Sequence, residues 1–78
     1  MNDLKNRLFE VVAQVFGANQ SEISIESDPD TIDGWDSVGH LNLMMAVEKA
    51  FEVKFKTDQI TQLDSVEKIF NALQETGI

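Results

Sequence analysis

The residues of this sequence best suited to chemistry are Asp36 and Ser37, which follow Gly34 and Trp35 and precede an apolar-rich segment ending near Phe51. We predict that Asp36 caps a helix there, because its carboxylate can accept a first-turn N–H at the positive end of the helix dipole. Ser37 is then the first helical residue and its hydroxyl is free. A phosphate ester on that hydroxyl would lie beside unpaired backbone N–H groups. We interpret Ser37 as an attachment point rather than a nucleophile.

The tripeptide Asp-Ser-Val weakens this interpretation because it occurs twice, at residues 36–38 and 64–66. We expect Asp64 to cap the last helix, with Glu67 completing a capping box. From local chemistry alone, Ser37 is better explained as a residue that merely follows a cap. The first copy differs in the acidic loop before it and the longer helix after it.

His40 lies three residues after Ser37, near enough on a helix for a proton acceptor to approach the hydroxyl. Acyl-transfer catalysis also needs a group that orients the histidine and an oxyanion site, and the sequence offers neither. The nucleophile-elbow pattern fails as well, since Trp35 occupies its first glycine position. We therefore expect His40 to face solvent or to contact a partner.

The loop before Ser37 is rich in acid and resembles a calcium loop only superficially. An EF-hand that begins at Asp28 requires an Asp or Asn, a Gly and a Glu where this sequence has Ile32, Asp33 and Gly39. We expect no dedicated metal site.

Length and composition limit the remaining functions. The chain has 78 residues, which we assign to a single domain, residues 1–78. Such a chain buries about 60 to 65 per cent of its unfolded surface, which leaves little room for an enclosed catalytic cleft. It contains no cysteine, so any thiol chemistry must be borrowed. The net charge of −8 argues against nucleic acid or an anionic membrane and favours a basic protein surface as partner.

Neither a signal peptide nor a run of 18 apolar residues is visible in the sequence. We therefore expect a cytoplasmic protein that does not enter the membrane, and a monomer.

The periodicity predicts an all-α fold, a small bundle of three main helices plus one short helix, with a long first loop. The first helix covers residues 3–16, with Asn2 or Asp3 as cap and Gly17 at its end. Residues 17–36 form the loop, which isoleucines pin to the core: Ile23, Ile25 and Ile32.

The second predicted helix, from Ser37 to about Phe51, is apolar almost all round, so it should lie centrally or leave apolar surface for a partner. A short extended link follows at residues 52–55, and then a helical turn from Thr57 through Ile60. The last helix covers residues 65–74 and ends at Gly77.

These features together resemble the acyl and peptidyl carrier protein family over essentially the whole chain. The resemblance is carried by Trp35-Asp36-Ser37-Val38 and, at matching distances, by Leu41, Leu43, Glu48, Phe51, Val53 and Phe55. It implies that Ser37 receives 4′-phosphopantetheine from coenzyme A through a phosphopantetheinyl transferase that also recognises Asp36. It further implies a non-catalytic carrier that presents acyl or aminoacyl thioesters to loading and processing enzymes with basic or apolar docking patches.

The sequence departs from fatty-acid-synthesis carriers along the exposed face of the second helix. Positions that are typically acidic there hold Gly39, Asn42 and Lys49, and only Glu48 remains. We interpret this as a specialised carrier for a dedicated pathway. We expect its partners to contact five residues of this helix: Val38, His40, Leu41, Met45 and Glu48. For Val38, Leu41 and Met45, ordinary core positions are an equal alternative, and Gly39 could allow close approach of the arm or a partner.

Two functions from other classes stay open at this point. One is an acidic helical adaptor that binds a basic or amphipathic helix and is never modified. The other is a small hydrolase that uses Ser37 and His40.

Overall fold

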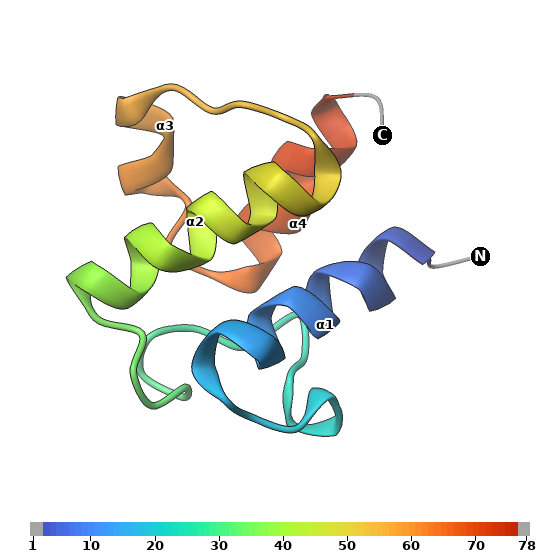
Figure 1. Ribbon diagram of the computed structural model, residues 1–78, viewed down its shortest axis with the longest axis vertical. Coiled ribbons are helices and arrows are strands. Elements are labelled where there is room, and N and C mark those ends of the chain that lie inside the picture. Colours follow the sequence, from blue (N-terminus) through green and yellow to red (C-terminus); the bar gives the residue numbers. More distant parts are fainter. Residues whose placement is uncertain (1–2, 77–78) are drawn as a thin grey trace.

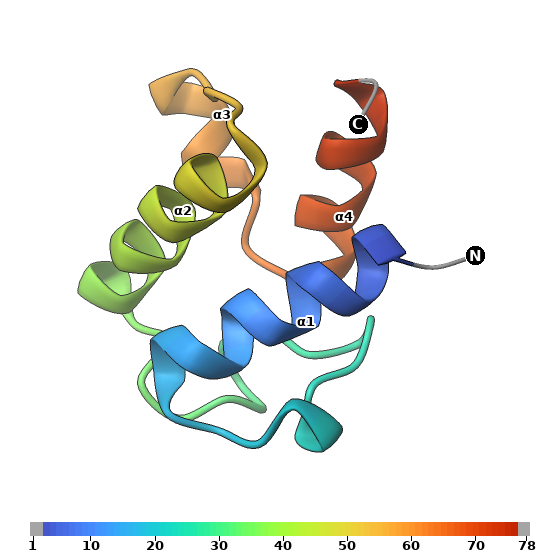
Figure 2. The ribbon, with the colours of Figure 1, turned by 45° about the vertical axis from the view of Figure 1, so that its right-hand side comes forward.

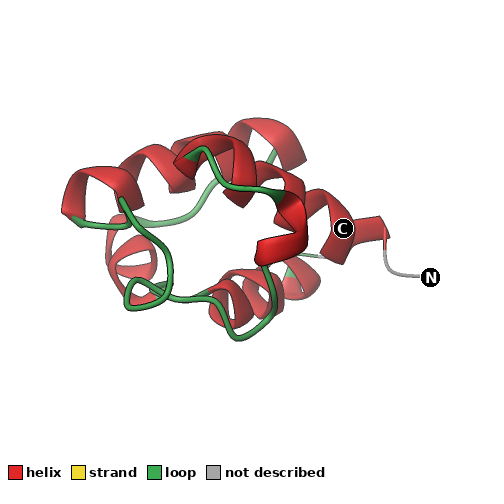
Figure 3. Cartoon of the chain, turned by 90° about the horizontal axis from the view of Figure 1, so that it is seen from below, coloured by secondary structure: helices red, strands yellow, loops and turns green. Residues whose placement is uncertain are grey.

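Four α-helices and one 3-10 helix make up most of residues 3–76, the part of the chain that the computed structural model describes. In chain order they are α1 (Asp3–Phe16), the 3-10 helix η1 (Gln20–Glu22), α2 (Ser37–Phe51), α3 (Thr57–Gln62) and α4 (Val66–Glu75) (Figure 1). Coloured by secondary structure, these residues show only helices and loops (Figure 3). The predicted fold class is confirmed, whereas η1 was not predicted.

The helices enclose one apolar core. The helix α1 contacts both α2 and α4, and it crosses the lower ends of both in Figure 2. The fully buried side chains come from these three helices: Leu8, Val12, Leu43, Met44, Val47, Val66, Ile69 and Leu73. The predicted apolar stripe of α1 thus faces the core, with Leu4, Val11 and Val15 packed partly buried at its margin. Within residues 3–76, no helix combines the length and apolar character needed to cross a bilayer.

Both expectations for α2 are confirmed. One side of the helix is buried through Leu43, Met44, Val47 and Phe51. The other side leaves three large apolar side chains exposed: Val38 at 67%, Leu41 at 56% and Met45 at 65%. An ordinary core role for these three residues is therefore wrong, and α2 presents apolar surface that the domain does not cover.

The first loop is held against the bundle. Ile23 and Ile32 are buried and Ile25 is partly buried, as predicted. The carbonyl of buried Ser27 accepts a hydrogen bond from Val66 N at 3.0 Å, which ties the loop to the first residue of α4. These contacts explain how a long connection stays ordered in a small domain.

The same loop uses one of its acids internally. The Asp28 carboxylate accepts hydrogen bonds from Asp30 N at 3.0 Å and from Thr31 N at 3.1 Å, an Asx turn.

The ends of the helices agree with prediction in part. Gly17 has φ +67°, and Ala18 N donates to the carbonyl of Ala13 at 2.9 Å, so α1 ends at this glycine as expected. Asp3 is the first residue of α1. The alternative cap, Asn2, and the predicted terminator Gly77 lie outside the described residues.

The predicted cap of α4 is wrong. The N-cap is Ser65, whose Oγ accepts from Lys68 N at 3.2 Å. Asp64 lies one residue earlier and pairs with the Lys68 ammonium at 2.8 Å. The capping box of Asp64 and Glu67 is therefore not formed, because the serine takes the cap position and shifts the register by one residue.

The end of the first loop packs closely on the first turn of α2. A Cβ atom added to Gly39 would lie 2.0 Å from the Gly34 carbonyl oxygen and 3.0 Å from the Phe16 ring. The close approach expected at Gly39 is therefore made by the chain's own backbone. Gly34 itself has φ +92°, a conformation that favours glycine.

This contact predicts that Gly39→Ala destabilises the domain. Helix propensity alone favours alanine by about 0.5 to 1 kcal/mol. The clash with a backbone carbonyl costs about 1 to 3 kcal/mol and reverses that sign. Urea unfolding followed by circular dichroism measures the difference.

The matched control is Asn42→Ala, at an exposed position of the same helix. We expect it to stabilise the domain by about 0.5 kcal/mol. A Gly39→Ala variant as stable as this control would contradict the packing described here.

Candidate functional site

The first turn of α2 holds Asp36 and Ser37 in different roles. Asp36 is the N-cap: its Oδ1 accepts from Gly39 N at 2.8 Å, and its carbonyl accepts from His40 N at 2.8 Å. Ser37 is the first helical residue and is exposed. Within residues 3–76 its hydroxyl has no hydrogen-bond partner, and neither do the backbone N–H groups of Ser37 and Val38. The predicted cap and the free serine hydroxyl are thus both observed.

The two Asp-Ser-Val copies are structurally different. In the first copy the aspartate is the cap and the serine lies free in the helix. In the second copy the serine is the cap and its hydroxyl is occupied by Lys68 N. The repeated tripeptide therefore provides one available serine, Ser37, and one structural serine, Ser65.

A cleft of about 460 Å³ lies beside Ser37. The first loop, α2, α3 and the link between α3 and α4 contribute its lining: Pro29, Trp35, Asp36, Ser37, His40, Leu41, Ile60, Thr61 and Asp64. Most of the lining surface is apolar. An apolar hollow next to a free hydroxyl suits a site that receives a group attached at Ser37.

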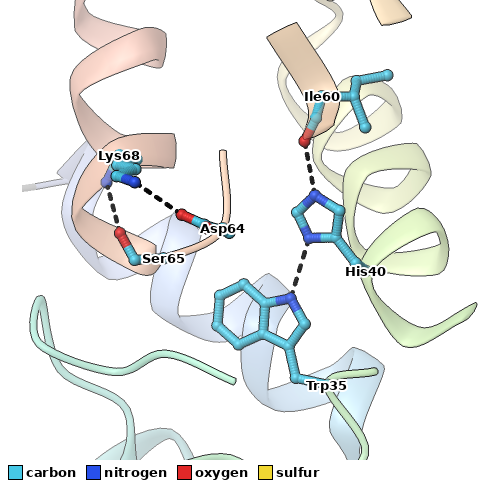
Figure 4. A network of polar contacts seen from close by, with 6 residues as sticks. All are labelled: Trp35, His40, Ile60, Asp64, Ser65 and Lys68. Carbon is cyan, nitrogen blue, oxygen red and sulfur yellow. Dashed lines mark hydrogen bonds and ion pairs between the residues drawn. The ribbon is translucent and has the colours of Figure 1, made fainter. Parts of the chain in front are cut away.

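His40 crosses this cleft from α2 to α3. Its Nε2 lies 2.7 Å from the carbonyl oxygen of Ile60, and its Nδ1 lies 3.0 Å from the indole Nε1 of Trp35 (Figure 4). The indole N–H can only donate and the carbonyl can only accept, so Nδ1 is the acceptor and Nε2 carries the proton. We call these three groups the Trp35–His40–Ile60 relay.

The hydrogen bonds of His40 contradict its predicted exposure and argue against the hydrolase alternative. His40 is half-buried with both ring nitrogens bonded, so the expectation that it faces solvent is wrong. A partner contact at His40 stays a prediction. Because both nitrogens are engaged elsewhere, the imidazole is not placed to take a proton from Ser37, and the hydrolase alternative lacks its base.

Trp35 lines the cleft, and the sequence did not indicate its contacts there. Its side chain is only 4% exposed and stacks on Phe16, with ring centroids 5.5 Å apart. A buried tryptophan N–H requires a hydrogen-bond acceptor, so the sequence could have indicated that Trp35 has a polar partner. The acceptor is five residues further on, and its second partner, Ile60, is 20 residues from it, so pattern alone could not identify the relay.

The remaining predicted contact residues lie along α2. Val38, Leu41 and Met45 share its exposed side, as does Lys49 near its end. Glu48 is half-buried, and its Oε2 accepts from Phe55 N at 2.8 Å. This acid therefore stabilises the 52–56 link, and its contact with a partner stays a prediction.

The Asp64 carboxyl is paired with a neighbouring cation. The hydrogen bond from Lys68 holds the pKa of the Asp64 carboxyl below its usual value, and burial opposes this slightly. Both side chains of the pair are more than half exposed, so the pair contributes little to stability. Within residues 3–76, no three His, Cys, Asp or Glu side chains are placed to hold a metal ion.

Comparisons with known proteins agree on one family. The family described as "Phosphopantetheine attachment site" matches residues 6–73. The acyl carrier protein of Phaeodactylum tricornutum is 32% identical over 74 residues, which cover 95% of this chain and 97% of that protein. Acyl carrier protein 2 of Pseudomonas aeruginosa is 29% identical over 75 residues, 96% of this chain and 95% of that protein.

The contrast between the two serines predicts that the same substitution destabilises the domain at Ser65 and not at Ser37. Ser65→Ala removes a cap and should lower the free energy of unfolding by about 1 kcal/mol. Ser37→Ala removes a hydroxyl without a partner and should change it by less than about 0.5 kcal/mol. Thermal or urea unfolding of the unmodified proteins gives both values, and equal losses would contradict the assignment of the caps.

Proposed function

Because this chain belongs to the phosphopantetheine-binding acyl carrier protein family, we propose that Ser37 is the residue that bears its 4′-phosphopantetheine. Proteins of this family are carriers rather than enzymes. The prosthetic group supplies a thiol that holds an acyl group as a thioester, which this cysteine-free chain cannot provide itself. The observation that carries the assignment is the exposed Ser37 hydroxyl, which has no structural task, in contrast to Ser65.

The residues around Ser37 fit this group. A phosphodiester carries negative charge, and the N–H groups of Ser37 and Val38 at the positive end of α2 are available to it. Asp36 satisfies Gly39 N and thereby leaves the other two amides free. The apolar cleft next to Ser37 offers partial shelter to an apolar cargo.

The domain contributes positioning rather than catalysis. Asp36 fixes the first turn of α2, so Ser37 is held at an exposed corner that an enzyme can reach. We propose that phosphopantetheinyl transferase recognises this corner and that acyl-processing enzymes dock on the exposed side of α2. Val38, Leu41 and Met45 are the apolar contacts in this proposal, since each leaves more than half of its surface exposed.

The charge of the same side supports a dedicated pathway. Asn42 and Lys49 are exposed there, and the carboxylate of Glu48 is turned to Phe55 N. A partner with a strongly basic patch would find little acid along this helix to pair with. We propose that this carrier serves partners that rely more on the apolar contacts, with either acyl or aminoacyl cargo. A cytoplasmic location and a monomeric state stay predictions.

The attachment site is tested by intact-mass measurement. The unmodified protein is incubated with coenzyme A, magnesium and a broad-specificity phosphopantetheinyl transferase. We expect one added phosphopantetheinyl group, lost in Ser37→Ala and retained in Ser65→Ala. An addition that survives Ser37→Ala, or no addition to the wild type, would refute the assignment and favour the unmodified adaptor.

The dedicated pathway is tested by exchange with fatty-acid-synthesis enzymes. We expect the phosphopantetheine-bearing protein to accept malonyl groups poorly from those enzymes and to support little elongation. Lys49→Glu should improve exchange several-fold by restoring an acid, whereas Lys68→Glu on α4 should not. Efficient malonyl loading and elongation on the wild type would show that the carrier is of the housekeeping type.

A further inference from the structure

The Trp35–His40–Ile60 relay joins the first loop to α3 across the cleft beside Ser37. Trp35 precedes Ser37 by two residues, and Ile60 lies in the middle of α3. Both residues line the cleft, with His40 between them. The two hydrogen bonds therefore set how far the loop end and α3 lie from each other at the place where the cleft opens toward Ser37.

The relay requires a neutral imidazole. His40 Nδ1 accepts the indole N–H of Trp35 at 3.0 Å, and the two ring planes are only 13° apart. A proton added to Nδ1 would oppose two donors at this distance. The bond from Nε2 to the Ile60 carbonyl survives protonation, because a protonated imidazole still donates there.

Protonation of His40 therefore breaks only the hydrogen bond to Trp35 and keeps the one to Ile60. Trp35 is 4% exposed, so its N–H would lose its acceptor without gaining water. An unsatisfied buried donor is unfavourable, and the indole must move to find a new partner. His40 would remain bound to α3 while the loop end that leads into Ser37 is released.

The groups that face His40 come from the loop end, from α3 and from the link before α4. Asp36 from the loop end and Asp64 from the link before α4 line the same cleft and attract a protonated imidazole. Lys68 of α4 pairs with Asp64 at 2.8 Å and offsets part of that attraction. The helix α3 contributes Ile60 and Thr61 to the cleft, and neither side chain titrates. On the far side of Trp35, α1 contributes the uncharged ring of Phe16.

We infer that His40 is a positioning residue which, in its neutral form, fixes the loop end before Ser37 to α3, and that its protonation releases this loop end and reshapes the cleft. The device itself depends only on the relay. Its consequence for a prosthetic group rests on the proposed attachment at Ser37.

The wild-type protein tests the device directly, since it contains one tryptophan, one histidine and no tyrosine. Nuclear magnetic resonance of the 15N-labelled protein should show His40 protonated on Nε2 at about pH 8. Between about pH 8 and 5, the indole N–H resonance should lose its hydrogen-bonded shift with the same midpoint as the His40 ring. A proton on Nδ1 at the higher pH, or an indole resonance that ignores the titration, overturns the inference.

Two variants separate this device from simple packing. His40→Phe keeps a ring but removes both hydrogen bonds. The fluorescence emission of Trp35, which should change with pH in the wild type, should therefore be independent of pH in this variant. The amide resonances of α3 should also shift. Asn42→Ala, on the exposed side of α2, should leave both unchanged. If His40→Phe does not fold, the wild-type titration still decides the question.

The consequence at Ser37 is measured as the rate of phosphopantetheine transfer by the same transferase. The wild-type rate is divided by the His40→Phe rate at each pH, which cancels the pH dependence of the transferase itself. This ratio should change with pH, and its midpoint should equal that of the His40 titration measured by magnetic resonance. A constant ratio refutes the consequence for the cleft. If the wild-type protein accepts no phosphopantetheine at any pH but the His40 and Trp35 resonances still titrate together, Ser37 is not the attachment site and the role of His40 stands. If transfer is normal but the two resonances do not titrate together, the role of His40 alone is refuted.

Discussion

The close packing of the first loop on the first turn of α2 is the constraint from which the rest of the site follows. The Gly34 carbonyl occupies the space that a side chain at Gly39 would need, and the Asp36 carboxylate binds Gly39 N. Trp35, between them, is buried on Phe16 and bonded to His40. With these neighbours fixed, Ser37 faces solvent at the helix start, beside the exposed Asp36 and Val38. Its exposure is thus a product of tertiary packing as much as of its own position.

Periodicity predicted the parts of this fold that depend on the burial of apolar surface. The apolar stripes of α1 and α4 and the isoleucines of the first loop face the core, because this is where their apolar surface can be buried. The fold class and the helix start at Ser37 followed from the same signals. Periodicity could not decide which side of α2 is buried, because the helix is apolar on two sides. The structure shows which of them the domain covers.

Two of the wrong predictions, the cap of α4 and the exposure of His40, concern polar groups with more than one possible partner. Asp64 and Ser65 are both good caps, and the choice between them depended on Lys68, which offers Asp64 an ion pair and Ser65 a backbone N–H. His40 was expected in solvent because its acceptor and donor partners come from distant parts of the chain. A sequence pattern lists the groups that can bond, whereas the choice among them is made by the packing of the backbone.

In the proposed function, the two sides of α2 give this small carrier its specificity without a catalytic group. The buried side fixes the helix in the core, so the exposed apolar residues are presented on a rigid support and lose little conformational entropy when a partner covers them. With Glu48 bonded to the 52–56 link and Lys49 exposed, α2 itself offers little acid for direct pairing with a basic partner. In the proposed docking, recognition then depends mainly on the shape of the contact surface at short range. In that proposal, the carrier discriminates after encounter by the fit of each partner to Val38, Leu41 and Met45.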